Sequence, residues 1–447
     1  MITRLEVDGF KSLRDFAVDL EPFTVFIGPN SAGKSNVLEA LALLSRLASQ
    51  PIPEAFKKGR GRPSDQFTRA GSETARTMRF AVEFLIHGEY RTGQPPSPGA
   101  QSRYRYELTI ERRALPSGTE RLLAREERLR AMRSEEDSWI QSRPGFAKYA
   151  TYAGGGANIF GSLLNDLAPQ MNRVVGLPPE PDEHQIPPSQ TALPPIRYFR
   201  VEDLRANLVA CRTLQMGTAR LGEPSDRIDS GDLAPDASNL PTVLAGLPPS
   251  LLGEIRADLV ALVPGIASFD VVPDGDEMRI DFELSGGDRM PARLVSDGTL
   301  RILVLLTALR LEPRPYLACI EEPENGIYPG RLRALLDLFR EEAMRQYDDP
   351  EALARLDARF PNLGAMRVIT NLLPTQLILT THSPVILAAL RKHPEHLRFV
   401  DAVRRDGHRL TRVRTVGPTS TADHGRFTVT PREIDLILDA TQSEDPA

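Results

Sequence analysis

Two hydrophobic patterns follow one another closely near the start of the chain. Residues 22–27 are almost continuously apolar, which is typical of a strand buried on both faces. Residues 35–44 repeat apolar side chains at helical spacing. The residues between them are small or polar. The pattern therefore predicts a buried strand, a tight loop and a helix, which is an α/β arrangement.

The rest of the chain mixes alternating strands, apolar strands and helices. Residues 1–20 alternate in two short runs and predict a β-hairpin. The other predicted strands cover residues 79–86, 104–110, 196–201, 267–272, 278–284, 316–320 and 376–381. Helices are predicted over residues 120–142, 240–262 and 302–311, and a proline- and glycine-rich link over residues 92–100.

Composition places the chain among globular proteins with a large core. It has 447 residues, of which 41% are hydrophobic and 26% charged, enough for two to three domains. The net charge of −5 gives no overall support for nucleic-acid binding, so any basic surface must be local. Cys211 and Cys319 show no disulfide or metal spacing. With no targeting peptide and no membrane-length apolar run, we expect a cytoplasmic protein without a membrane partner.

The loop after the first buried strand carries a phosphate-binding pattern. Residues 28–35 read G-x-x-x-x-G-K-S, and Gly28 and Gly33 let the backbone N–H groups curl around a polyphosphate at the positive end of a helix. Lys34 is placed to reach the β and γ phosphates, and the Ser35 hydroxyl to hold Mg²⁺. The alternative is a chance glycine turn before a helix. The predicted loop comprises Gly28, Pro29, Asn30, Ser31, Ala32, Gly33, Lys34 and Ser35.

Two further buried strands end in residues suited to phosphate chemistry. Glu321 and Glu322 follow the strand at 316–320, where parallel α/β sheets bind ligands. Glu321 is placed to hold Mg²⁺ and Glu322 to polarise an attacking water, or both belong to a solvated acidic turn. His382 ends the strand at 376–381 and is either a γ-phosphate sensor or a structural histidine. The turn before residues 302–311 is an anion site or simply a helix cap.

Four motifs in this order resemble those of a known group of ATPases. GPNSAGKS, SDGTLR, IEEPENG and TTHSP are similar to the ABC-type ATPase heads of the RecF and SMC group. They are closer still to compact bacterial AAA family ATPases related to the heads of the overcoming-lysogenization-defect (OLD) nucleases. GFKSL at residues 9–13 and DASNL at residues 236–240 also match, whereas residues 90–230 match only in general layout.

The resemblance implies an α/β P-loop NTPase fold with an ABC-type head. Such a head has a mixed sheet core, an antiparallel β subdomain and a helical subdomain, here with an insertion between the Walker A and signature motifs. The implied divisions are residues 1–90 and 231–400 for the two parts of the head, 91–230 for an insertion, and 401–447 for a basic hairpin and tail.

The resemblance also implies a role for each matching residue. Residues 28–36, including Asn36, are the Walker A loop, Glu321 is the Walker B acid, Glu322 the catalytic glutamate and His382 the switch histidine. Ser296 and Gly298 form the signature motif, which in this group faces the γ-phosphate held by a second protomer. Asn325 and Gly326 lie in the dimer-contacting D-loop. Two chains would then hold two ATP molecules, with Mg²⁺, head to tail.

This chain departs from the wider ABC pattern at three places. The signature reads SDGT rather than LSGGQ, which argues against a membrane transporter subunit. The Walker B acid is Glu321 where aspartate is usual, so the metal geometry differs slightly. Gln66 and Gln190 are both candidates for the Q-loop glutamine, and the sequence does not choose between them.

Two basic segments could contact DNA, and the sequence does not decide whether they do. Residues 57–62 predict a basic loop, and residues 403–414 predict a basic β-hairpin around Asp406 and Gly407. Each either contacts the phosphate backbone of double-stranded DNA or is a solvated charged surface. Prolines and glycines interrupt the interval where an SMC protein has its coiled coil. From the length of the segment after His382, we expect no Toprim nuclease domain of the kind that OLD proteins carry.

The sequence thus predicts an ATPase that acts as an ATP-gated switch. The switch is expected to be a homodimer or higher homo-oligomer that engages DNA or controls a separately encoded effector, for example a nuclease. Genome maintenance or anti-phage defence is the context that the resemblance implies. The alternative is a very slow or inactive nucleotide-gated scaffold that binds or sequesters a protein partner.

Overall fold

The computed structural model describes most of the predicted elements. The described residues are 1–70, 73–86, 102–152, 208–209, 211–216, 221–228, 232–311, 315–348, 375–405, 408–416, 428–430 and 432–435. The strand predicted at 196–201, the link at 92–100 and Gln190 lie outside them. Within these ranges, no helix combines the length and the apolar character that crossing a membrane requires.

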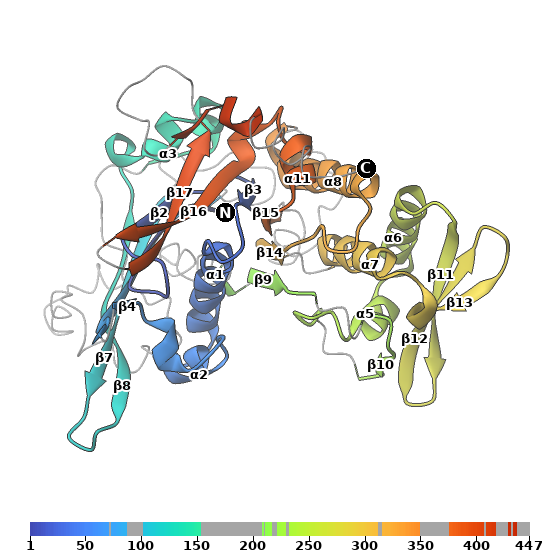
Figure 1. The fold of residues 1–447 in the computed structure, drawn as a ribbon, viewed down its shortest axis with the longest axis horizontal. Helices are drawn as coiled ribbons and strands as arrows, with labels where there is room; N and C mark the ends of the chain where they lie inside the picture. The colour runs from blue at the N-terminus through green and yellow to red at the C-terminus, as the bar shows by residue number, and fades with distance from the viewer. Residues whose placement is uncertain are drawn as a thin grey trace, which may run out of the picture.

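A seven-stranded sheet runs through the centre of the molecule (Figure 1). Its order is β18–β17–β16–β3–β15–β14–β9, and the five strands from β16 to β9 are mutually parallel. The parallel strands are β3 (Phe23–Ile27), β9 (Cys211–Leu214), β14 (Leu317–Glu321), β15 (Gln376–Thr381) and β16 (Leu397–Arg405). The three predicted apolar strands β3, β14 and β15 are confirmed and lie side by side at its centre.

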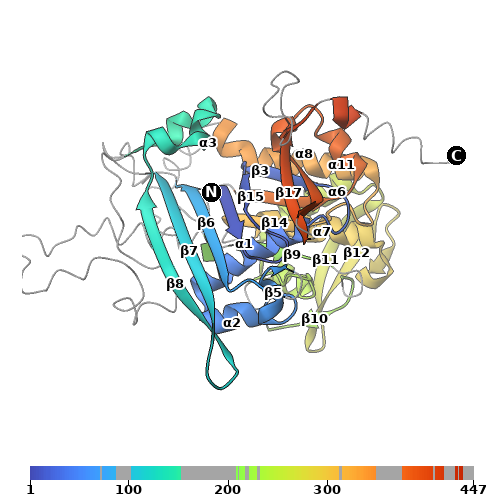
Figure 2. The ribbon, with the colours of Figure 1, turned by 60° about the vertical axis from the view of Figure 1, so that its left-hand side comes forward.

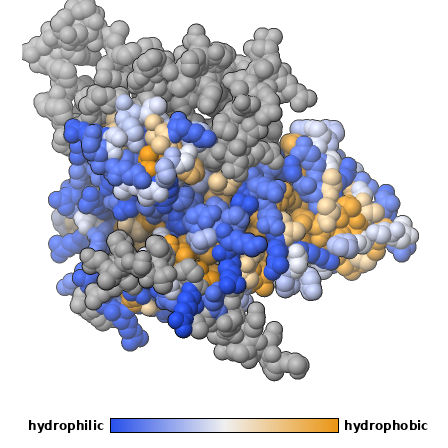
Figure 3. All heavy atoms as spheres, turned by 90° about the horizontal axis from the view of Figure 1, so that it is seen from above, coloured by the Kyte–Doolittle hydropathy of each residue, from blue (hydrophilic) through white to orange (hydrophobic). Residues whose placement is uncertain are grey.

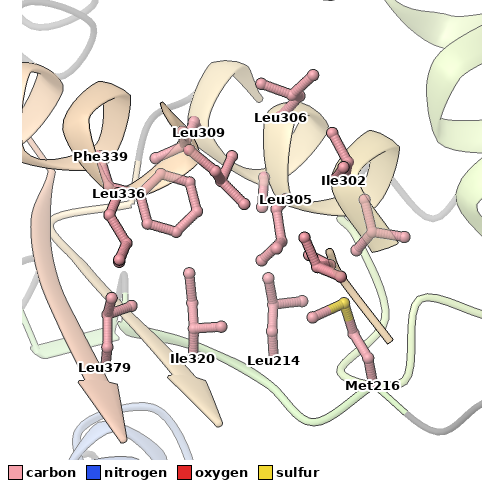
Figure 4. Packing of buried hydrophobic residues seen from close by; sticks show 14 of the residues in the cluster. Leu214, Met216, Ile302, Leu305, Leu306, Leu309, Ile320, Leu336, Phe339 and Leu379 are labelled. Carbon is pink, nitrogen blue, oxygen red and sulfur yellow. The ribbon is translucent and has the colours of Figure 1, made fainter. Parts of the chain in front are cut away.

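Side chains of the central strands alternate between two cores. Ile320 and Leu379 pack beneath two helices on one face, as Figure 4 shows, while Cys319 and Ile378 point to the opposite face. Burial on both faces explains why apolar side chains predominate in these strands, where the few polar residues such as Thr24 and Gln376 are themselves buried. The helices on the first face are α7 (Asp297–Arg310), α8 (Pro329–Asp348) and α11 (Pro384–Ala389), and α1 (Lys34–Ser49) covers the second.

A five-stranded antiparallel sheet encloses the other side of α1 (Figure 2). Its order is β2–β1–β6–β7–β8, and β1 and β2 form the predicted N-terminal hairpin. The strands are β1 (Ile2–Asp8), β2 (Phe16–Asp19), β6 (Thr77–Leu85), β7 (Arg103–Ala114) and β8 (Glu120–Ala131). The β strands at the start of the chain and those beyond residue 100 therefore belong to one layer.

The prediction of a helix over residues 120–142 is wrong. Residues 120–131 form β8, which pairs with β7 from Ala114 opposite Glu120 to Tyr104 opposite Ala131. Only η2 (Ser134–Glu136) and the single turn α3 (Ser138–Gln141) follow. Leu122 and Leu129 are seven positions apart, which suits one face of a helix, but in the strand both face the core because the register shifts between Thr109 and Ile110 of β7. The strand forms because β7 is a long antiparallel partner, which satisfies the backbone N–H and C=O groups of alternate residues of β8.

A smaller subdomain forms the far end of the molecule. The predicted strands 267–272 and 278–284 are confirmed as β11 (Ile266–Asp274) and β12 (Glu277–Leu284), joined by β10 (Ser225–Asp226) and β13 (Arg289–Pro291). Seen from above, the described part of the face in Figure 3 is largely hydrophilic, and apolar side chains show over the widest area at this end, with others near the middle. The predicted helix 240–262 is instead two helices, α5 (Leu240–Gly246) and α6 (Pro249–Leu262), because Pro248 and Pro249 interrupt the backbone hydrogen bonds.

The predicted C-terminal hairpin is confirmed. β16 pairs antiparallel with β17 (His408–Val416), from Arg398 opposite Thr415 to Arg405 opposite His408, and the turn residues Asp406 and Gly407 lie outside the described ranges. The remaining short elements are α2 (Ile52–Lys57), η1 (Pro63–Gln66), β4 (Arg69–Ala70), β5 (Glu73–Thr74), η3 (Pro144–Tyr149), η4 (Ala292–Leu294), η5 (Pro394–His396) and β18 (Thr428–Val429).

A buried histidine sits at the entrance to β16. The side chain of His396 is 4% exposed, and its ring meets Phe23 edge-on with 5.4 Å between centroids. Burial lowers the pKa of His396 to about 4. The facing titratable or charged groups are Glu395, which opposes this lowering, and His393, Arg340 and Arg398, which add to it.

This histidine should make the protein less stable in mild acid. The unfolded chain takes up the proton near the ordinary value of 6.5 and the folded chain only near 4. The His396 contribution is therefore complete above pH 6.5 and is lost as the pH falls toward 4. Urea unfolding at about pH 7.5 and about pH 5 should differ by about 2 kcal/mol from this group.

Two variants separate His396 from other titrating groups. His396→Gln should flatten the pH dependence of unfolding between neutral pH and about pH 5. His393→Gln removes a more exposed neighbouring imidazole and should leave the dependence in place. An undiminished dependence in His396→Gln would contradict the assignment.

Candidate functional site

The P-loop leaves β3 at Ile27 and closes onto α1. Gly33 has φ of +105° and Ser31 of +62°, both in the left-handed region, which bends the loop sharply before the helix. Gly28 packs against β16, where a Cβ would collide with the carbonyl oxygen of Val400. Pro29, Asn30 and Ser31 are exposed and Ala32 is buried. The predicted strand, glycine loop and helix are all present.

Lys34 turns its ammonium group back across this loop. Its Nζ donates hydrogen bonds to the carbonyl oxygens of Gly28 (2.7 Å) and Pro29 (2.9 Å). Burial lowers the pKa of Lys34, and the carboxylates of Glu322, Glu324 and Glu321 oppose that lowering. The predicted phosphate-binding cation thus lies in the field of the three acids at and just after the end of β14. Ser35, the predicted Mg²⁺ ligand, is half-buried at the next position.

The register of the central sheet brings the predicted motifs to one edge. Glu321, the last residue of β14, lies beside Thr380 of β15, and Thr381 lies beside Ile27 of β3. The strands are parallel, so the P-loop, the acids and the His382 segment leave the sheet at the same end. This juxtaposition was predicted from the strand ends alone.

Glu321 offers an oxygen that the described residues do not use. Its Oε1 is buried and has no hydrogen-bond partner among them, and its Oε2 accepts a hydrogen bond from Arg60 Nη2 at 3.2 Å. An unpartnered buried carboxylate oxygen is costly unless a cation or water completes it. Glu321 together with the Ser35 hydroxyl therefore fits the oxygen donors that Mg²⁺ prefers.

Glu322 is held in a strained backbone conformation. Its φ is +47°, which a non-glycine residue seldom adopts. Its N–H donates to the carbonyl oxygen of Thr380 (2.9 Å), and Asn325 Nδ2 donates to its Oε2 (3.0 Å). Nδ1 of His382 lies 3.4 Å from its Oε1. The predicted catalytic glutamate, D-loop asparagine and switch histidine thus form one group.

Glu324 is a site residue that the sequence reasoning missed. Its Oε1 accepts hydrogen bonds from the Thr381 hydroxyl and from the backbone N–H of His382 (3.2 Å). Its Oε2 is buried without a partner among the described residues. Glu324 therefore fixes the end of β15 against the acidic turn. A third acid in the run 321–324 was the available signal.

Arg60 was also missed as a site residue. It comes from the basic segment 57–62, whose predicted roles were contact with DNA or a solvated loop. Its Nη2 donates hydrogen bonds to Glu321 Oε2 (3.2 Å) and to Gln215 Oε1 (2.7 Å). Its Nη1 lies 3.7 Å from Glu39 Oε1. Arg60 and Glu321 are 261 positions apart, and no local pattern links them.

The structure assigns Gln66 a structural role instead of the Q-loop role. Gln66 is buried, and its Nε2 donates to the carbonyl oxygen of Phe56 at 2.7 Å. The glutamine that reaches the site through Arg60 is Gln215, which was not a candidate. The other candidate, Gln190, lies outside the described residues.

The predicted signature residues begin α7 and rest on the predicted D-loop. Ser296 caps this helix, and its Oγ accepts a hydrogen bond from the Thr299 N–H. Gly298 is so close to Gly326 that a Cβ would collide with the Gly326 carbonyl oxygen. Among the described residues, no hydrogen bond or ion pair joins Ser296 or Gly298 to residues 28–36. The signature and the P-loop are therefore separate within one chain.

The fold and the site place the chain in the class of P-loop proteins, with a glycine loop between a buried strand and a helix and acids at the end of a parallel strand of the same sheet. A family model described as "AAA domain, putative AbiEii toxin, Type IV TA system" matches residues 23–388. The chain belongs to this family. The match spans the P-loop, residues 296–298, Glu321, Glu322 and His382.

Two curated proteins match shorter segments. "Structural maintenance of chromosomes protein 1" of Schizosaccharomyces pombe is 35% identical over 99 residues, 20% of this chain and 8% of that protein. The "OLD nuclease" of Thermus scotoductus is 39% identical over 61 residues, 12% of each. The chain thus matches only a small part of the length of either relative.

Solved SMC head structures align with nearly the whole chain at low similarity. A SmcHead bound to the C-winged helix domain of ScpA has a TM-score of 0.47 and 14% identity, covering 93% of this chain and 98% of that one. An SMC head domain from Thermotoga maritima has a TM-score of 0.42 and 11% identity, covering 93% and 99%.

Proposed function

We propose that this protein binds ATP with Mg²⁺, hydrolyses it, and works as an ATP-gated dimeric switch. The observation that carries the proposal is the convergence of Lys34, Glu321, Glu322 and His382 at the carboxyl ends of three adjacent parallel strands. These groups are a phosphate-binding cation, a metal-binding acid, a base and a sensor, which together suffice for phosphoryl transfer to water.

Each side chain has a task that its position supports. Lys34 and the P-loop N–H groups hold the β and γ phosphates. Ser35 and Glu321 would hold Mg²⁺, which would neutralise part of the phosphate charge. Glu322 accepts a proton from, or orients, the attacking water, and Asn325 and His382 orient Glu322.

Separation of the signature from the P-loop supports the dimeric part of the proposal. Within the described part of one chain, no hydrogen bond or ion pair joins Ser296 or Gly298 to residues 28–36, yet Ser296 caps a helix whose N-terminus suits an anion. A second protomer placed head to tail would bring this helix end to the γ-phosphate. The composite site then closes with ATP and opens after hydrolysis.

Steady-state hydrolysis by the purified protein tests the enzymatic part. We expect phosphate release that depends on added Mg²⁺ and stops with a chelator, because the orphaned Glu321 oxygen needs its cation. ATP binding with turnover near background would instead favour the nucleotide-gated scaffold. Absence of nucleotide binding would refute both.

Duplex DNA added at low and moderate salt separates the two outputs of the switch. Stimulation that weakens with salt is expected if the protein engages DNA, since phosphate contacts release counterions. A rate indifferent to DNA would point to a separately encoded protein effector, sought among proteins that co-purify. Genome maintenance or anti-phage defence is the context we propose for either output.

A further inference from the structure

The C-terminal hairpin lies directly against the P-loop. Gly28 packs on the Val400 carbonyl of β16, and a Cβ on Gly33 would collide with the Thr411 hydroxyl of β17. Thr411 and Ala32 are 379 positions apart in the chain. Thr411 is 5% exposed, so its hydroxyl must find partners within the protein. The hairpin therefore forms one wall of the phosphate-binding loop.

A chain of hydrogen bonds runs through Thr411 to the loop. Asn36 Nδ2 donates to Ser12 Oγ (2.6 Å), Ser12 Oγ and Thr411 Oγ1 lie 2.6 Å apart, and Thr411 Oγ1 donates to the Ala32 carbonyl (3.0 Å). A hydroxyl has a single proton, so the proton shared by the two hydroxyls comes from Ser12. All donors then point from α1 toward the P-loop, and such aligned bonds strengthen one another.

The Ala32 carbonyl determines where the next N–H points. In a planar trans peptide the C=O and the following N–H point in opposite directions. With the carbonyl of Ala32 turned toward Thr411, the N–H of Gly33 is turned away from the hairpin. Among the described residues this N–H has no acceptor. In a P-loop the backbone N–H groups are the donors that cradle phosphates.

We propose that Thr411 is a positioning residue of the nucleotide site, whose hydroxyl holds the Ala32–Gly33 peptide so that the Gly33 N–H faces a phosphate. The proposal rests on the proposed function, because it requires that the loop binds a nucleotide. The backbone N–H of Thr411 donates to the Ser12 carbonyl at 3.0 Å, which fixes β17 against the turn that supplies Ser12. Without the hydroxyl, the peptide loses its anchor and phosphate binding must reorient it.

Nucleotide affinity of matched variants tests this role. Binding of a non-hydrolysable ATP analogue with Mg²⁺ is measured by calorimetry for wild type, Thr411→Val, Thr411→Ser and Ser12→Ala. Thr411→Val should weaken binding about tenfold, as loss of one anchored hydrogen bond does, while Thr411→Ser stays within about twofold. KM for ATP should rise with little change in kcat.

A double variant shows whether the two hydroxyls act in series, and a substitution at Thr415 serves as its control. Ser12→Ala combined with Thr411→Val should weaken binding no more than Thr411→Val alone, since both interrupt one chain. Thr415→Val makes the same chemical change at an exposed position of the same strand and should leave affinity unchanged.

The outcomes distinguish this inference from the proposed function. Wild type that binds no nucleotide refutes the proposed function before any variant is compared. Wild-type affinity in Thr411→Val, or equal weakening in Thr411→Ser, overturns the positioning role. If Thr411→Val fails to fold, Thr411→Ala decides, because it removes the same hydroxyl without placing a methyl group against the Ala32 carbonyl: weakened binding supports the role and unchanged binding overturns it.

Discussion

Replacing Glu322 by glutamine should lower the rate of ATP hydrolysis by about 100-fold or more while ATP binding persists. Glutamine keeps the shape of the side chain and the contact with Asn325 but removes the carboxylate that accepts or orients the proton of the attacking water. The strained φ of +47° is unchanged, because both residues carry a Cβ. Single-turnover phosphate release and ATP binding are the measurements.

The same variant should accumulate as an ATP-bound dimer. Hydrolysis is the step that reopens the proposed composite site, so blocking it leaves the closed state populated. Light scattering with ATP and Mg²⁺ detects the change in mass. Glu277→Gln, at an exposed glutamate on β12, is the matched control and should behave as wild type. A Glu322→Gln protein that stays monomeric with ATP would refute the proposal that the protein is a dimeric switch.

Replacing Gly33 by alanine should abolish ATP binding, with a loss of about 100-fold or more. Two costs combine: φ of +105° strains any residue with a Cβ, and that Cβ collides with the Thr411 hydroxyl. Relief of the collision must move either the loop or the hairpin, and each movement disturbs the Ala32–Gly33 peptide. Calorimetry with an ATP analogue and thermal unfolding measure the two effects.

Gly265 provides the matched control for this substitution. Its φ of +98° is nearly the same, but a Cβ there meets nothing within 4 Å. Gly265→Ala should therefore cost about 1 kcal/mol of stability from backbone strain alone and leave ATP binding unchanged. A Gly33→Ala variant as mild as Gly265→Ala would show that the hairpin does not constrain the P-loop.

Local patterns predicted the parts of the site that lie within single motifs. The glycines and Lys34 follow an apolar strand and precede a helix, and each feature is legible within about ten residues of sequence. Glu321, Glu322 and His382 were predicted because strand ends in a parallel sheet converge on one edge. The family match was likewise anticipated from the order of the four motifs.

Local patterns failed where a distant partner decided the outcome. Residues 120–131 became β8 because β7 was available to pair with them. Arg60 lies in the site because folding brings its loop to Glu321. Gln66 does not reach the site because its side chain donates a hydrogen bond to the carbonyl oxygen of Phe56. None of these partners can be identified by periodicity, since the period describes which face is buried but not what covers it.

By itself, the sequence determined the three central strands β3, β14 and β15 and the chemistry at their ends, because hydrophobic period and glycine placement act over a few neighbouring residues. The tertiary structure alone decided which side chains hold those elements in working geometry. Glu324 on the end of β15, Arg60 on Glu321 and Thr411 on the P-loop each join segments far apart in the chain. Such contacts depend on how the layers pack, and packing is a property of the whole fold.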